Sequence, residues 1–176
     1  MARLFYAIWP DESSTERLRA LAESLAPRTG GRPVPRDNIH LTLAFLGELD
    51  DERAAVAATV SVKFRSFQLS LDRLGSFRRA RVSWAGSAQA PQALMKLESG
   101  LVGTLRDLGF ALEERPFAAH VTLLRKIERT LAAEPIEAIA WNVREVTLVA
   151  SRAGRYEVIE RWPCLGSHPR GNDGGE

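Results

Sequence analysis

Two histidines and two threonines recur in the same pattern at two places in the chain. The two stretches are His40-Leu41-Thr42-Leu43 and His120-Val121-Thr122-Leu123. Successive side chains of a β-strand point to opposite faces, so each histidine shares a face with the threonine two residues later. The chain has only 3 histidines, and chance is a poor explanation for two matching pairs. Each predicted strand therefore presents an imidazole beside a hydroxyl.

Paired imidazoles are suited to acid–base catalysis. An unperturbed imidazole has a pKa of about 6.5, so one ring can be neutral and the other protonated near neutral pH. The hydroxyls of Thr42 and Thr122 would donate hydrogen bonds to an anion held between His40 and His120. In-line displacement at phosphate needs a base on one side and an acid on the other, and a cyclic phosphodiester fits this requirement especially well. The four residues therefore predict a phosphodiesterase site with two catalytic histidines.

This chemistry demands neither a covalent intermediate nor a metal. Two histidines without cysteines or carboxylates at ligand spacing are a weak zinc signature. No glycine-rich phosphate-binding loop is present in the sequence. We therefore expect no metal and no cofactor.

The first half of the chain alternates predicted strands with predicted helices. Pro10 would close the first strand, Asp11 or Ser13 would cap the first helix, and Gly47 would end the first His-Thr strand. In chain order, we expect a strand over residues 4–9, a helix over 11–25 and a loop over 29–35. A strand over 38–46 and an alanine-rich helix over 50–62 follow.

The second half is expected to contain a hairpin, a helix and three further strands. The hairpin is predicted over 67–84, with its turn at 77–81, and the helix over 91–108. The second His-Thr strand follows over 119–124, and a helix or turn region over 128–139. The last two strands are predicted over 143–151 and 156–162. Each His-Thr strand follows a strand and a helix, which indicates two related lobes. The prediction is an α+β, bilobal fold in which two pseudo-symmetric lobes carry antiparallel sheets that line a central cleft, with the helices outside. Residues 1–166 would form this single domain, and 167–176, which lack apolar side chains, would be a disordered tail.

Composition excludes a membrane protein. The chain has 176 residues and 45% hydrophobic content, enough for one ordinary domain. No apolar run approaches the roughly 20 residues that cross a bilayer, and the apolar start is too short and too aromatic for a secretion signal. The single Cys164 fits a reducing compartment. We expect a cytoplasmic monomer without membrane contacts.

Positive charge is mild overall but clustered. The formal net charge is +2. The first cluster follows Phe77 and consists of Arg78, Arg79 and Arg81. The second follows the second His-Thr motif and consists of Arg125, Lys126 and Arg129. Both clusters are candidates for holding phosphates, and solvated turns and strand ends are the alternative.

The chain resembles the 2H phosphoesterase superfamily, named for two His-x-Thr/Ser-x motifs. Within it the resemblance is to the bacterial and archaeal RNA 2′,3′-cyclic phosphodiesterases, formerly called 2′-5′ RNA ligases. It covers most of the chain and is carried by residues 4–10, 38–47, 115–117, 120–125 and 147–149. Ala119 stands where proline usually precedes the second histidine, and Leu124 stands where a small residue is usual. Neither departure removes a proton-transferring group.

The resemblance implies hydrolysis of a 2′,3′-cyclic phosphate to a 2′-phosphate, with RNA 3′ ends or small cyclic nucleotides as partners. It implies that His120 is the general base that activates water and that His40 is the general acid that protonates the departing 3′ oxygen. Thr42 and Thr122 would hold the nonbridging oxygens. The residues alone do not orient the histidine pair. Reversal of the same chemistry would join a 2′-phosphate to an adjacent hydroxyl, as in 2′-5′ ligation, without a nucleotide cofactor.

Phe45 and Arg125 each stand five residues after a motif histidine. Arg125 is a candidate for neutralising the phosphate, and Phe45 is a candidate for stacking on the terminal base. Strict alternation would put both on the face opposite the histidines, so these roles require a twist or strand end that redirects them. Core packing of Phe45 and a plain surface position of Arg125 are the alternatives.

Two other functions fit the same residues. One is an RNA-end or nucleotide-binding module that uses the cleft without turnover, and the other is a 2H phosphodiesterase for a different substrate. Retention of both histidines and both threonines favours an enzyme, because binding alone would tolerate their loss.

Overall fold

The computed structural model describes residues 1–166. Its elements are β1 (Ala2–Ile8), α1 (Glu12–Thr29), β2 (Arg32–Pro33), the 3₁₀ helix η1 (Arg36–Asn38), β3 (Leu41–Leu49), α2 (Asp51–Ala58), β4 (Phe67–Phe77), β5 (Val82–Gly86), α3 (Gln92–Asp107), β6 (His120–Arg125), β7 (Glu134–Val143), β8 (Glu145–Arg152) and β9 (Arg155–Pro163). The predicted α+β class with antiparallel pairing is confirmed.

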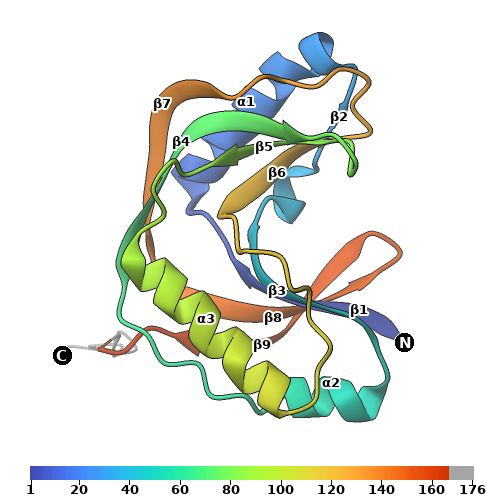
Figure 1. Ribbon diagram of the computed structural model, residues 1–176, viewed down its shortest axis with the longest axis vertical. Helices are drawn as coiled ribbons and strands as arrows, with labels where there is room; N and C mark the ends of the chain where they lie inside the picture. Colours follow the sequence, from blue (N-terminus) through green and yellow to red (C-terminus); the bar gives the residue numbers. More distant parts are fainter. Residues whose placement is uncertain (167–176) are drawn as a thin grey trace, which may run out of the picture.

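The strands form one antiparallel sheet with a narrow junction at its centre. Their order is β7-β4-β5-β6-β3-β1-β8-β9, and β2 pairs with β6. Strands β3 and β6 meet through a single residue pair, Leu41 and Val121. We call β3-β1-β8-β9 the first half-sheet and β7-β4-β5-β6 the second half-sheet. The two half-sheets diverge from the Leu41–Val121 junction (Figure 1).

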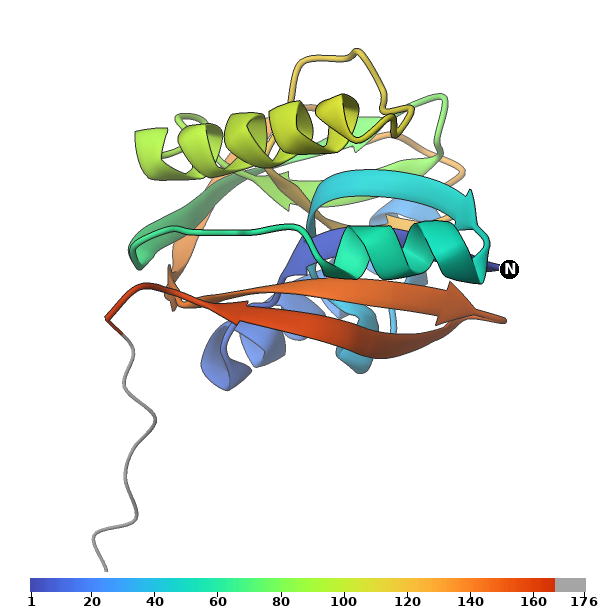
Figure 2. The same ribbon diagram turned by 90° about the horizontal axis from the view of Figure 1, so that it is seen from below.

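The two long helices, α1 and α3, pack on strands of the half-sheet that they do not follow in sequence. Helix α1 follows β1 of the first half-sheet, yet it packs against β2, β6 and β7. Helix α3 follows β5 of the second half-sheet and packs against both β3 and β4. The two helices lie on opposite sides of the molecule (Figures 1 and 2). One hydrophobic cluster contains residues of both half-sheets and all three helices.

Local sequence explains where helix α1 begins and how helix α3 packs. The Asp11 side chain accepts a hydrogen bond from the Ser14 N–H at 2.8 Å, which caps α1. Helix α3 buries one stripe at three- and four-residue spacing, as an amphipathic helix should. That stripe consists of Leu94, Leu97, Leu101 and Leu105.

One element predicted from the sequence is wrong. The predicted helix or turn region over 128–139 contains most of β7, which pairs with β4 from Phe67 to Leu74. Ile139, Trp141 and Val143 alternate as the buried residues of the strand's second half. Pairing with a strand far away in sequence therefore decides the structure of this segment.

Other differences concern element boundaries. The first His-Thr strand begins at Leu41, not at Asn38, because residues 36–38 form η1. The strand also continues beyond Gly47, which has a φ of 76°, to Leu49. Residues 32–33, within the predicted loop, form β2. Helix α1 extends to Thr29, and helix α2 ends at Ala58.

No helix within residues 1–166 is long and apolar enough to span a bilayer. The predicted disordered tail, 167–176, lies outside the described residues.

Gly75 provides room for a ring next to His120. Gly75 of β4 pairs with Trp84 of β5, and a Cβ added at Gly75 would overlap the Trp84 indole. The Trp84 ring centroid lies 6.4 Å from that of His120. A glycine is therefore required here by close packing against an aromatic wall of the cleft.

We expect Gly75→Ala to lower the free energy of unfolding by about 1–3 kcal/mol, because the added methyl forces Trp84 to move. Gly100→Ala is the matched control: Gly100 lies within α3 with no atom near the added Cβ. This control should raise stability by about 0.5–1 kcal/mol through helix propensity. Urea denaturation measures both; equal stability of the two variants would contradict the packing argument.

Candidate active site

The Leu41–Val121 junction brings the two motifs together. In an antiparallel ladder, one step from this pair places His40 opposite Thr122 and Thr42 opposite His120. All four side chains line one pocket with a cavity volume of about 50 Å³, which we call the catalytic pocket. Its other lining residues are Val34, Asn38 and Arg125.

His40 is held in one tautomer by the backbone. Its Nδ1 lies 2.7 Å from the Asn38 carbonyl oxygen. A carbonyl only accepts hydrogen bonds, so Nδ1 carries the proton of the neutral ring and Nε2 is the free acceptor. Nε2 lies 2.9 Å from Thr42 Oγ1, and the Thr42 hydroxyl therefore donates to it in the neutral state.

His120 repeats this arrangement. Its Nδ1 lies 2.7 Å from the carbonyl oxygen of Ala118, again two residues earlier in the chain. The neutral His120 ring therefore also carries its proton on Nδ1 and keeps Nε2 as an acceptor. Both rings have the basic nitrogen that proton transfer requires.

Aromatic rings surround both histidines, and the sequence analysis did not identify them as site residues. The ring centroid of His40 lies 4.8, 5.3 and 5.5 Å from those of Phe5, Trp9 and Tyr156. The ring centroid of His120 lies 5.0 Å from that of Phe77, in an edge-on contact. The alternation of Phe5, Ala7 and Trp9 could have indicated an aromatic face near the first motif.

This burial controls the protonation of both rings. Burial lowers the pKa of His40 to about 4, with smaller contributions from the positive charges of Arg125 and His120, while the Asn38 carbonyl opposes the shift. Burial also lowers the pKa of His120, and the Ala118 carbonyl again opposes it. Both imidazoles are therefore neutral at pH 7, and a bound anion would raise the pKa of each.

Phe45 and Arg125 are redirected by matching irregularities in their strands. The register of β3 against β1 shifts between the Ala44 and Thr42 pairs, and that of β6 against β5 shifts between the Leu124 and Thr122 pairs. One extra residue, Leu43 or Leu123, reverses the alternation at the same place in each motif. The side chains at Phe45 and Arg125 are consequently exposed. Arg125 also lines the catalytic pocket, so its predicted role at the phosphate is geometrically possible.

A larger groove adjoins the catalytic pocket. It has a volume of about 980 Å³ and shares Thr42 and His120 with that pocket. We call it the adjoining groove. Phe45 lines it with 51% of its surface exposed, so Phe45 is not a core residue.

The two basic clusters of the sequence meet at the far side of the β4–β5 turn. Arg78 and Arg81 of the first cluster and Arg129 of the second line a third pocket of about 400 Å³, which shares Arg78 with the adjoining groove. Arg129 is engaged there, since it donates to the carbonyl oxygens of Arg28 and Pro27 at 3.0 Å each.

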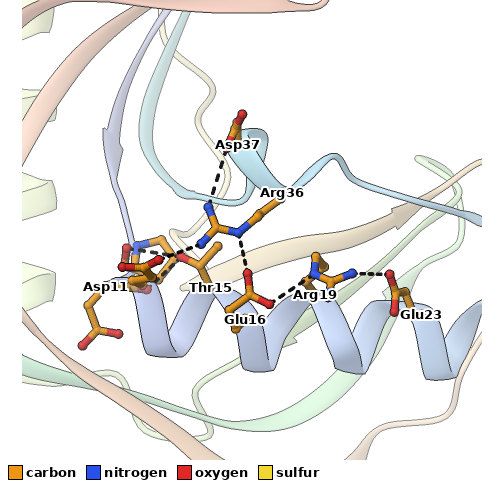
Figure 3. Close-up of polar contacts among 9 residues, drawn as sticks. Asp11, Thr15, Glu16, Arg19, Glu23, Arg36 and Asp37 are labelled. Carbon is orange, nitrogen blue, oxygen red and sulfur yellow. Dashed lines mark hydrogen bonds and ion pairs between the residues drawn. The ribbon is translucent and has the colours of Figure 1, made fainter.

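The segment that leads into the first motif is attached to α1 by ion pairs. Arg36 of η1 contacts Glu12 and Glu16 of α1, and Glu16 also contacts Arg19 (Figure 3). The hydrogen bond from Arg36 holds the pKa of Glu16 below its ordinary value. These exposed pairs contribute little individually, but together they attach η1, which supplies the Asn38 carbonyl to His40.

Within residues 1–166, no group of three or more His, Cys, Asp or Glu side chains is placed to hold a metal ion.

Comparison with known proteins agrees with this geometry. Residues 8–84 match the family described as LigT like Phosphoesterase. The chain is 36% identical over 168 residues to the RNA 2′,3′-cyclic phosphodiesterase of Escherichia coli strain K12, covering 91% of this chain and 95% of that one. The chain belongs to the RNA 2′,3′-cyclic phosphodiesterase family. Members of this family are phosphoric diester hydrolases, and the predicted enzyme class is confirmed.

Solved structures of an RNA 2′,3′-cyclic phosphodiesterase family member have the same fold. E. coli LigT complexed with 3′-AMP superposes with a TM-score of 0.82 at 34% identity, covering 93% of this chain and 98% of that one. E. coli LigT complexed with phosphate gives a TM-score of 0.77 at 33% identity, with coverages of 93% and 97%. The predicted 2H phosphoesterase-like fold is confirmed.

The lowered pKa of His40 makes folding stability depend on pH. Below pH 6.5 the unfolded chain binds a proton at His40 that the folded chain takes up only near pH 4. Stability is therefore lost as the pH falls through this window, by about 2 kcal/mol between pH 7 and pH 5. Urea denaturation at pH 7, 6 and 5 measures the loss, and His40→Gln should show a clearly smaller one. Equal pH dependence in the two proteins would contradict the burial effect.

Proposed function

We propose that this chain hydrolyses the 2′,3′-cyclic phosphate of an RNA 3′ end or a small cyclic nucleotide to a 2′-phosphate, through acid–base catalysis by His40 and His120. The observation that carries this proposal is the catalytic pocket itself. It is lined by two imidazoles whose Nδ1 atoms donate to backbone carbonyls, so both Nε2 atoms are unprotonated in the neutral rings, and that of His40 accepts from the Thr42 hydroxyl. The E. coli relative solved with 3′-AMP and with phosphate supports a nucleotide phosphate as the ligand.

The proposed reaction needs one proton acceptor and one proton donor. His120 Nε2 takes a proton from water, the water oxygen forms a bond to phosphorus, and the bond from phosphorus to O3′ breaks. Protonated His40 gives its proton to O3′, so the products are a 2′-phosphate and a 3′-hydroxyl. Exchange with solvent then returns both rings to their starting protonation states. The same groups acting in reverse would join a 2′-phosphate to an adjacent hydroxyl.

The phosphate oxygens are assigned to the remaining polar groups of the catalytic pocket. The hydroxyls of Thr42 and Thr122 hold the nonbridging oxygens, and the guanidinium of Arg125 neutralises their charge. Phe45 stacks on the terminal base from the adjoining groove.

Substrate binding and proton uptake are coupled in this scheme. Free His40 is neutral at pH 7 because burial lowers its pKa to about 4, whereas the general acid must be protonated. The negative charge of the bound cyclic phosphate raises the pKa of His40 and allows it to take up a proton. Substrate thereby creates the acid that its own cleavage needs.

We expect His40→Ala and His120→Ala each to lower kcat by a factor of about 10² to 10⁴, because each removes one proton-transfer group. The assay uses an oligonucleotide ending in a 2′,3′-cyclic phosphate and identifies which hydroxyl of the product retains the phosphate. The wild-type product should be a 2′-phosphate, and EDTA should not change the rate.

His168→Ala is the matched control, because it removes the third histidine of the chain from a position outside the two motifs. Circular dichroism establishes that each variant is folded. Near-normal turnover by either motif variant, or a 3′-phosphate product, would contradict the proposed mechanism.

Arg125→Ala is expected to raise KM by about 10- to 100-fold, the effect of losing a charged hydrogen bond of about 1.5–3 kcal/mol. Arg125→Lys keeps the charge and should recover part of the loss. Steady-state kinetics on the same oligonucleotide give KM for both variants. An unchanged KM for Arg125→Ala would remove this residue from the phosphate site.

A further inference from the structure

The adjoining groove is much larger than the catalytic pocket. Its volume is about 980 Å³, against about 50 Å³ for the catalytic pocket from which it extends. Pockets that enclose one drug-sized ligand, the size class of a nucleoside, measure about 300–1,000 Å³. The groove lies at the upper end of this range, so its size is compatible with a terminal nucleoside and a neighbouring part of the chain.

One wall of the groove carries uncompensated positive charge. The β4–β5 turn lines it with Phe77, Arg78, Arg79 and Ala80. Both arginines are exposed, and within residues 1–166 neither takes part in a salt bridge. By contrast, Arg28 is paired with Glu134 at 3.0 Å. Free guanidinium groups beside the catalytic pocket are suited to phosphates of the substrate backbone.

The same wall carries an exposed aromatic ring. Phe77 has 36% of its surface exposed and lies edge-on to His120 with ring centroids 5.0 Å apart. Phe45 is the second exposed ring of the groove, at 51%. Exposed rings next to arginines are the usual elements of sites for single-stranded nucleic acids. Two rings provide stacking positions for two successive bases.

The remaining lining of the groove carries charges of both signs. It contains Glu98 of α3 and Glu113 of the segment before β6, together with Arg115. Burial raises the pKa of Glu98, which makes its charged form less favourable. Carboxylates repel phosphates and accept hydrogen bonds from the amino groups of bases. Phosphates of a bound strand are therefore favoured at the arginines of the β4–β5 turn over these carboxylates.

We propose that the adjoining groove binds the single-stranded RNA immediately 5′ of the cyclic phosphate, with the second base on Phe77 and the linking phosphates on Arg78 and Arg79. This inference rests on the proposed function and adds a substrate preference to it. An RNA end is a better substrate than a free cyclic mononucleotide.

The first experiment compares uridine 2′,3′-cyclic phosphate with an unstructured uridine trinucleotide that ends in the same group. We expect kcat/KM of the trinucleotide to be at least about tenfold higher, the effect expected for one stacked base. Its logarithm should also fall more steeply with the logarithm of salt concentration, by about 0.7 for each phosphate held.

The second experiment changes the charged wall. Arg78→Ala combined with Arg79→Ala should reduce the trinucleotide-to-mononucleotide ratio of kcat/KM severalfold and flatten the additional salt dependence. The double lysine variant, Arg78→Lys with Arg79→Lys, should retain most of both. Arg65→Ala is the charge control, because Arg65 is exposed and lies outside the groove; its ratio should match the wild-type value.

The outcomes separate this inference from the proposed function. A wild-type enzyme that cleaves both substrates with equal kcat/KM would overturn the inference and leave the proposed function intact. A high ratio that survives the double alanine substitution would overturn the assignment of the linking phosphates to the two arginines. If neither substrate yields a 2′-phosphate, the proposed function fails and the inference fails with it.

Discussion

The site depends on one backbone contact between the two half-sheets. Leu41 and Val121 are the only residue pair that joins β3 to β6 in the described chain. Their side chains are fully buried. The residues before and after each of them therefore point towards the cleft. Antiparallel pairing gives this junction a local two-fold relation that exchanges His40 with His120 and Thr42 with Thr122. Because the strands diverge beyond this pair, space for a substrate opens directly beside the four side chains.

Backbone groups, more than side chains, determine what these imidazoles can do. Carbonyl oxygens of Asn38 and Ala118 fix the same tautomer in both rings. The aromatic surroundings then lower both pKa values by excluding water from the charged form. The two histidines nevertheless differ, since Thr42 donates to His40, and the rings around His40 bury it more deeply. A symmetric pair of motifs thus places its two imidazoles in different surroundings.

Strand alternation is local, and for this reason the sequence was sufficient to place His40 with Thr42 and His120 with Thr122 on one face. Alternation alone was misleading for Phe45 and Arg125, because the shifts at Leu43 and Leu123 arise from pairing with β1 and β5. The same limit explains β7, whose strand structure depends on β4. The rings around His40 come from residues 5, 9 and 156, which only the folded sheet brings together.

The position of β1 has a consequence for how the protein is made. This N-terminal strand lies between β3 and β8, so its second edge is covered only by residues 147–151. On a ribosome, the chain must emerge up to residue 151 before that edge is fully paired, although both motifs have already been synthesised. Such pairing between distant segments slows folding and leaves an open strand edge in the nascent chain. Activity should therefore arise late in synthesis, when the C-terminal hairpin β8–β9 docks.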